Sequence, residues 1–247
     1  MFPYRDDNPT ELTPFITVGL IVLNVLTWVL IQGMGAPQPL AHSVCRLGLI
    51  PGELLRTVPP HTVVPLGEGL ACATTAHPAY ATVLTSMFMH GGWFHLIGNM
   101  WFLWIFGNNV EDAMGHGRFV IFYLLCGLVA AGTQVAASAH SAVPMIGASG
   151  AISGVLGAYL VLFPRVRVQT LIFLGVFATT VALPAYLMLL YWFGLQLLGG
   201  LPSLAGVQGG GVAFFAHIGG FVAGAALIRL FLRSDFRLRT RASPPDA

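Results

Sequence analysis

The stretch FVIFYLLCGLVAAGTQVAA at residues 119–137 contains no charged side chain. Its length is close to the roughly 20 mostly apolar residues with which a helix crosses the hydrocarbon core of a bilayer. The whole chain of 247 residues is 56% hydrophobic and only 8% charged, whereas a soluble domain carries about 25% charged residues. So few charges exclude a soluble enzyme, a disordered tail and a nucleic-acid-binding protein. The sequence therefore predicts an all-α, multi-pass integral membrane protein.

Further apolar segments lie on both sides of this stretch. Residues 171–198 are too many for one crossing and too few for two with a turn, at 1.5 Å of rise per residue. Pro184 divides this segment, so we predict a span at its C-terminal end, preceded by a shorter interfacial or irregular piece. We expect six spans, with seven as the alternative; besides residues 119–137 they are, approximately, residues 14–31, 83–107, 147–163, 183–198 and 212–232.

The arginines predict the orientation of the chain. With six spans, Arg118, Arg165 and Arg167 lie on the same side as a basic tail at about residues 233–247. The positive-inside rule makes this side cytoplasmic, together with both termini, and directs a Pro-rich loop at about residues 33–82 outward. All basic residues are arginine, and no organelle presequence is recognisable, which favours a bacterial inner membrane. We expect residues 1–247 to form a single membrane domain.

The three cysteines give limited information. Cys45 and Cys72 share the Pro-rich loop, and the sequence leaves open whether they form a disulfide in an oxidising compartment. Cys126 lies in an apolar run and is expected to pack as a small hydrophobic residue. The set lacks the CxxC spacing of a zinc site.

Polar residues inside predicted spans are costly and therefore indicate function. Ser149 lies in PMIGASGA at residues 144–151, where a loop leads into an apolar helix. Unpaired N–H groups and the positive end of the helix dipole at such a position would stabilise an oxyanion. Gly147 would allow close approach of a substrate backbone. The alternative is a serine that only caps the helix, followed by Gly150 and Gly154 at a spacing that permits tight helix packing.

His217 lies well inside the last span, and Gly220 and Gly224 follow on the same helical face. Such a smooth face could pack against Gly150 and Gly154 and bring the imidazole beside Ser149. A neutral imidazole there could accept the serine proton and later return it. The alternative is a structural histidine bonded to a backbone carbonyl.

His95 and Asn99 are four residues apart and project from one face of the second span. Both donate hydrogen bonds without an obligatory charge, which suits an oxyanion-binding wall, although interhelical hydrogen bonding would explain them equally. His90 precedes them and is expected to anchor the entry to the helix. Three histidines without an acid or a thiolate do not favour a metal site, and we predict neither a metal nor a small-molecule cofactor.

Taken together, these motifs resemble the rhomboid family of intramembrane serine proteases. The order is His90-x4-His95-x3-Asn99, Gly107-x3-Glu111-x3-Gly115, Gly147-Ala148-Ser149-Gly150 and Ala216-His217-x2-Gly220-x3-Gly224. The resemblance implies a rhomboid-like bundle that cleaves transmembrane segments of membrane proteins within the lipid bilayer. It also implies that Ser149 is the nucleophile and His217 the general base, without an acid. His95, Asn99 and the Ser149 N–H are the implied oxyanion donors, while Glu111 and Arg118 are expected to be structural.

The sequence departs from the family pattern at two places. Ala81 and Thr82 replace a Trp-Arg pair that many members carry, and Ser153 replaces an aromatic residue that packs on the histidine. We therefore expect Phe214, Phe215 or a residue of the fifth span to hold His217. Other hypotheses are a catalytically inactive rhomboid-like protein that binds client transmembrane helices, a small transporter or channel, and a scaffold. A serine–histidine dyad predicts that activity falls on the acid side as His217 becomes protonated.

Overall fold

A computed structural model of the chain describes residues 2–67, 70–174, 177–204 and 212–236. Part of the connection before the last predicted span, residues 205–211, lies outside this range. The predicted basic tail lies outside it from residue 237 onward.

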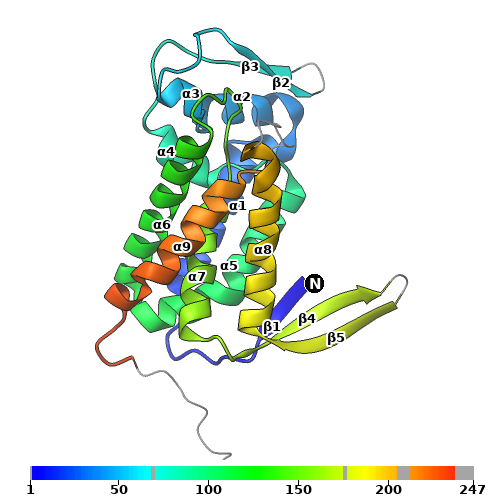
Figure 1. Cartoon of the computed structure of the whole chain (residues 1–247), viewed down its shortest axis with the longest axis vertical. Helices are drawn as coiled ribbons and strands as arrows, with labels where there is room; N and C mark the ends of the chain where they lie inside the picture. The colour runs from blue at the N-terminus through cyan, green and yellow to red at the C-terminus, as the bar shows by residue number, and fades with distance from the viewer. Residues whose placement is uncertain (1, 68–69, 175–176, 205–211, 237–247) are drawn as a thin grey trace, which may run out of the picture.

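In the described part of the chain, six long helices lie side by side and form one bundle (Figure 1). They are α1 (Phe15–Leu30), α5 (Trp93–Met114), α6 (His116–Ala137), α7 (Ser149–Leu162), α8 (Ala185–Leu204) and α9 (Phe214–Phe231). Among the described residues, α6, α9 and the part Ala185–Pro202 of α8 are long and apolar enough to span a membrane, and α1 and α7 are shorter apolar helices. The predicted helical bundle is therefore confirmed: six helices form it in the described part of the chain, and three of them are long and apolar enough to span a membrane.

The second helix begins ten residues later than the prediction of about residue 83. Residues 82–88 form a short helix α4 (Thr82–Thr85) and a 3₁₀ turn (Ser86–Phe88), and α5 starts only after Gly92. Glycine loses more backbone entropy in a helix than any other residue, so the pair Gly91–Gly92 separates the two helices. Apolar composition alone predicts one continuous span here, because it does not register this glycine break.

The segment before Pro184 is a β-hairpin rather than an irregular piece. Strands β4 (Arg167–Leu174) and β5 (Phe177–Pro184) pair antiparallel, and β1 (Phe2–Asp6) adds to the free edge of β4. The β-branched run Thr179, Thr180 and Val181 favours a strand. Pro184 ends β5, and α8 begins at the next residue, so the predicted division at this proline is confirmed.

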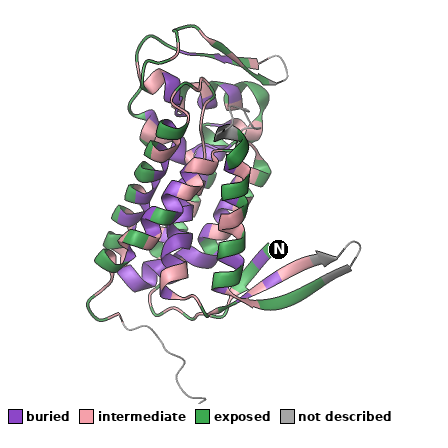
Figure 2. Cartoon of the chain, viewed as in Figure 1, coloured by how far each residue is buried: buried purple, intermediate pink, exposed green. Residues whose placement is uncertain are grey.

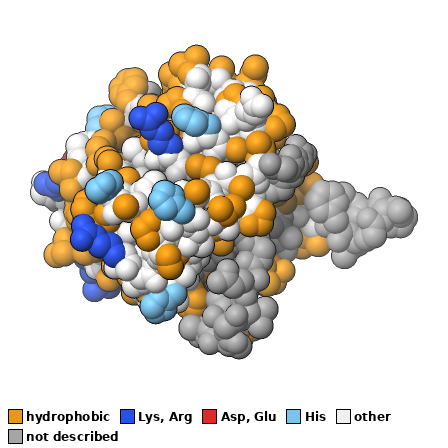
Figure 3. Space-filling model, turned by 90° about the horizontal axis from the view of Figure 1, so that it is seen from above, with side chains coloured by type: hydrophobic (Ala, Val, Ile, Leu, Met, Phe, Trp, Pro, Cys, Tyr) orange, Lys and Arg blue, Asp and Glu red, His pale blue; other side chains and the backbone are white. Residues whose placement is uncertain are grey.

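The two ends of the bundle are built differently (Figure 1). At one end, the Pro-rich loop forms a cap that contains η1 (Gly33–Gly35), α2 (Pro37–Leu47), α3 (Pro51–Leu54), β2 (Val63–Gly67) and β3 (Leu70–Ala73). A disulfide joins Cys45 to Cys72 within the cap, with a Cα–Cα distance of 5.3 Å. Seen from above, the cap face carries Arg and His side chains that are scattered among hydrophobic ones, without a continuous basic patch (Figure 3).

At the other end, the chain before α1 meets the connection between α7 and α8, because β1 pairs with β4. The end of α9 lies there too, since Arg118 at the start of α6 donates a hydrogen bond to the carbonyl of Leu232. An even number of crossings separates these three points, as a six-span topology requires.

Helix α7 forms the centre of the bundle. Every residue from Gly150 to Tyr159 is buried, as expected for a helix that is enclosed by neighbours on all sides. Buried residues lie mainly on the inner faces of the surrounding helices and exposed residues on the outer faces (Figure 2). Large apolar side chains such as Leu30 and Leu230 are exposed. Lipid tails would cover these outer side chains. Ser149, the first residue of α7, thus lies where the enclosed helix meets the cap.

Candidate active site

Ser149 is held at the start of α7 by the loop that precedes it. The Gly147 N–H donates to the carbonyl of Ser86 at 2.9 Å, and Met145 pairs with Leu49 of the cap through two backbone hydrogen bonds. Gly147 has a φ of +129°, and a Cβ there would lie 2.8 Å from His95 Nε2. Only glycine fits this position, since both the backbone conformation and the space exclude a side chain.

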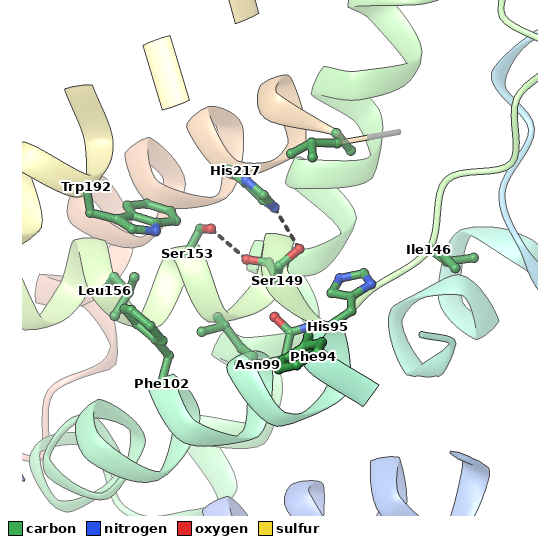
Figure 4. Close-up of a pocket in the computed structure, with 14 residues that line it drawn as sticks. Phe94, His95, Asn99, Phe102, Ile146, Ser149, Ser153, Leu156, Trp192 and His217 are labelled. Carbon is green, nitrogen blue, oxygen red and sulfur yellow. Dashed lines mark hydrogen bonds between the residues drawn. The ribbon is translucent and has the colours of Figure 1, made fainter. Parts of the chain in front are cut away.

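Helix α9 packs on α7 through small residues at backbone contact. A Cβ at Gly220 would lie 2.0 Å from the carbonyl oxygen of Gly150, and a Cβ at Gly224 would lie 1.9 Å from that of Gly154. The predicted packing between these two glycine faces is therefore confirmed. It brings His217 of α9 to Ser149 of α7, where the imidazole Nε2 lies 2.7 Å from the serine Oγ (Figure 4).

The fifth predicted span, α8, contacts the other side of the imidazole. His217 Nδ1 lies 2.8 Å from Gln196 Oε1, and the centroids of the His217 and Trp192 rings are 5.9 Å apart. Ser153 replaces the aromatic residue expected from the family, and its hydroxyl donates to the Ser149 carbonyl at 2.6 Å. Of the alternatives drawn from the sequence, a residue of the fifth span is therefore the one that contacts the histidine.

His95 and Asn99 form the opposite wall of the site on α5 (Figure 4). His95 Nδ1 accepts a hydrogen bond from the Gly91 N–H at 3.3 Å, so the ring proton of a neutral His95 is carried by Nε2, which faces the site. The side-chain nitrogen of Asn99 is buried and has no hydrogen-bond partner among the described residues. An unpaired buried donor is costly, and an oxyanion formed at Ser149 would satisfy it.

A cavity of about 320 Å³ lies between these two walls and is lined by Ser149, His217, His95 and Asn99. The rest of its lining is mostly apolar, and its large side chains include Phe94, Phe102, Ile146, Ile152, Leu156 and Trp192. An apolar cavity with a few polar groups at one place is typical of a site that binds an uncharged ligand segment and orients one polar bond.

His90 lies outside the site. Its ring is fully buried and packs edge-on against His95 with a centroid distance of 5.2 Å. Burial and the neighbouring His95 lower the pKa of His90 to about 3. Its backbone N–H and carbonyl pair with the side-chain amide of Gln32, each at 2.8 Å. The backbone of His90 therefore fixes the entry to α5, whereas both ring nitrogens are buried without a hydrogen-bond partner among the described residues, so an anchoring role of the side chain stays a prediction.

Three glutamines that the sequence motifs do not include hold the site together. Gln32 clamps the backbone of His90, Gln134 accepts a hydrogen bond from the Ala216 N–H at 3.2 Å, and Gln196 contacts His217. Gln134 and Gln196 are uncharged amides within predicted spans, so the rule that singled out the histidines would have found them too. Among the described residues, no group of three or more His, Cys, Asp or Glu side chains could hold a metal ion.

Comparison with known proteins places these features in one family. The model of the Rhomboid domain matches residues 77–234. Presenilin-associated rhomboid-like protein, mitochondrial, from Mus musculus is 35% identical over 114 residues, which are 43% of this chain and 29% of the relative. Rhomboid protease GluP from Bacillus subtilis is 42% identical over 78 residues, which are 32% of this chain and 15% of the relative. RHOMBOID-like protein 1 from Arabidopsis thaliana is 31% identical over 151 residues, which are 61% of this chain and 34% of the relative. The aligned regions thus span about a third or less of the length of these relatives. Because the family model covers more than half of this chain, the chain belongs to the rhomboid family.

Proposed function

We propose that this protein is an intramembrane serine endopeptidase that cleaves membrane proteins in or near a transmembrane segment. The observation that carries the proposal is the 2.7 Å contact between Ser149 Oγ and His217 Nε2, inside an apolar cavity at the start of a buried helix. A serine and a histidine at hydrogen-bonding distance are the minimum that an activated nucleophile requires. The relative named rhomboid protease adds support from the family.

In the proposed mechanism, Ser149 Oγ attacks a peptide carbonyl carbon while its proton passes to His217 Nε2. The carbonyl oxygen becomes an oxyanion that accepts hydrogen bonds from His95 Nε2, the Asn99 amide and the Ser149 N–H. His217 then gives its proton to the leaving amine, and the C–N bond breaks. A water molecule then attacks the acyl carbon and gives a proton to His217 Nε2. The ester C–O bond to Ser149 breaks, His217 returns the proton to Ser149 Oγ, and the new carboxyl terminus leaves.

The substrate class follows from the surroundings of the dyad. The reacting groups lie among apolar side chains and at the end of an enclosed helix, so a substrate must present an extended, largely apolar stretch of backbone. A transmembrane helix can do so where small or helix-breaking residues let it unwind locally. We therefore propose substrates with a membrane-spanning segment.

The disulfide supports the same membrane orientation as the distribution of the arginines. Disulfides form and persist in oxidising compartments, so the Cys45–Cys72 bond supports an outward-facing cap. Both termini are then cytoplasmic, which agrees with the arginine distribution, and we propose a bacterial inner membrane as the location. In that orientation the cavity lies toward the outer end of the bundle.

A fluorophosphonate probe tests the proposal without knowledge of a substrate, because it reacts covalently with activated serines. Detergent-solubilised protein should be labelled, and both Ser149→Ala and His217→Ala should abolish labelling. Ser141→Ala, in the loop before the site, serves as the matched control and should label like the wild type. The labelling rate should also fall on the acid side as His217 takes up a proton.

A folded wild-type protein that takes up no probe would refute the proposal and would favour an inactive rhomboid-like protein that binds client helices. Equal labelling of the wild type and Ser149→Ala would exclude Ser149 as the nucleophile.

A further inference from the structure

Helix α8 supplies the only side-chain oxygen that the described structure places against His217 Nδ1. Gln196 is buried, with 9% of its surface exposed, and its Oε1 lies 2.8 Å from that nitrogen. On the opposite side of the ring, Nε2 faces Ser149 Oγ at 2.7 Å. The imidazole is therefore held between an amide and the nucleophile, from two different helices.

The orientation of the Gln196 amide is fixed by its second contact. Its Nε2 lies 3.3 Å from the carbonyl oxygen of Trp192, one turn earlier in α8. A carbonyl oxygen can only accept, so the NH₂ group must face Trp192 and the amide oxygen must face the imidazole. The reverse orientation would set two acceptors against each other at Trp192.

This orientation selects one tautomer of His217. An amide oxygen accepts a hydrogen bond, so Nδ1 carries the proton and donates it to Gln196. The lone pair of a neutral imidazole is then on Nε2, where it accepts the hydroxyl proton of Ser149. The other tautomer would direct an N–H toward Ser149 and would leave the buried Gln196 oxygen without a donor, which is costly.

We propose that Gln196 is a positioning residue that keeps His217 in the tautomer and rotamer required of a general base. The inference rests on the proposed function. When Ser149 attacks, the Oγ–H bond breaks and the proton moves to Nε2, while the proton on Nδ1 stays there and its hydrogen bond to Gln196 strengthens on the imidazolium. The neutral amide thus takes the orienting part that a carboxylate plays in a serine–histidine–aspartate triad.

The experiment compares two substitutions of similar size in full-length protein. Gln196→Leu removes the acceptor, whereas Gln196→Glu keeps an oxygen at the same distance along the side chain. We expect the fluorophosphonate labelling rate to fall about tenfold in Gln196→Leu, the factor that one hydrogen bond typically contributes, and to recover at least half of that loss on a logarithmic scale in Gln196→Glu. Leu197→Ala, at an exposed position of the same helix, should label at the wild-type rate.

A spectroscopic readout separates tautomer selection from a general structural role. In protein with ¹⁵N-labelled histidine, the signals of His217 are identified by their loss in His217→Ala. Wild type should show Nδ1 protonated and Nε2 unprotonated, and Gln196→Leu should show a mixture of tautomers at an unchanged melting temperature. An unchanged tautomer, or an unchanged labelling rate, in folded Gln196→Leu would overturn this inference alone. Absence of Ser149-dependent labelling in the wild type would overturn the proposed function instead.

Discussion

Replacing Gly220 with alanine tests whether the contact between α7 and α9 sets the distance within the dyad. A Cβ at this position would lie 2.0 Å from the carbonyl oxygen of Gly150, whereas ordinary contacts begin at 3.4 Å. The obstacle is backbone, which has no rotamer to change. The two helices must therefore separate by about 1.4 Å if the contact is to become ordinary.

Such a separation would break the dyad, because Ser149 is the residue before Gly150 and His217 lies three residues before Gly220. If His217 follows its helix, its 2.7 Å distance to Ser149 grows to about 4 Å, beyond the range of a hydrogen bond. Positioned general bases contribute roughly 10²- to 10⁴-fold to rates. We therefore expect Gly220→Ala to lower the fluorophosphonate labelling rate at least about 100-fold, and overpacking to cost about 1–3 kcal/mol of stability.

The assay measures the labelling rate and the melting temperature of the same detergent-solubilised samples. Gly132→Ala in α6 is the matched control, since a Cβ there meets no heavy atom within 4 Å; its labelling rate should equal that of the wild type. Labelling of folded Gly220→Ala within a few-fold of the wild-type rate would refute the argument that glycine packing sets the catalytic distance.

Three further predictions concern the framework and are read from thermal unfolding unless stated. Burial raises the pKa of Asp6 to about 6, so the contribution of Asp6 to stability is present at low pH and is lost as the pH rises through 6. The wild type should therefore gain stability relative to Asp6→Asn when the pH is lowered from 7 to 4. A stability difference that does not change with pH would contradict this. Glu111 accepts hydrogen bonds from the Thr17 N–H at 2.8 Å and the Thr17 hydroxyl at 2.7 Å. Glu111→Gln should therefore lower the free energy of unfolding by about 1–3 kcal/mol, and an unchanged melting temperature would show that these hydrogen bonds do not stabilise the start of α1. The Cys45–Cys72 bond closes a loop with a sequence separation of 27 residues, and breaking it should lower the free energy of unfolding by about 3–4 kcal/mol. Intact mass with and without reductant establishes whether the bond is present. Equal stability of Cys45→Ser and the wild type would contradict this prediction.

Part of the fold could be predicted because its determinants are local in sequence. Long apolar runs give helices of membrane-spanning length, and Pro184 gives the boundary before α8. The glycines of α7 and α9 likewise reveal their faces through spacing alone, so the approach of His217 to Ser149 follows from two short motifs.

Other features depend on partners that are distant in sequence. The predicted span starts at about residue 14 and α1 begins at Phe15, but the N–H groups of Ile16 and Thr17 in its first turn are satisfied by Glu111, near the C-terminal end of α5. The hairpin β4–β5 is stabilised by β1 from the opposite end of the chain. Neither pairing leaves a periodic signal, since each depends on how the chain returns to the same end of the bundle.

The geometry of the dyad therefore has two separate determinants. Backbone packing of Gly220 on Gly150 sets how close α9 approaches α7, and the amide of Gln196 sets which nitrogen of the imidazole carries the proton. The glycines act through steric contact between α9 and α7, and Gln196 acts through a hydrogen bond from α8. Because one controls distance and the other controls protonation, a change in α8 can alter the reactivity of Ser149 without moving it relative to His217. The small residues explain why His217 reaches Ser149, and the amide of Gln196 would let His217 act as the proposed general base without a carboxylate beside it.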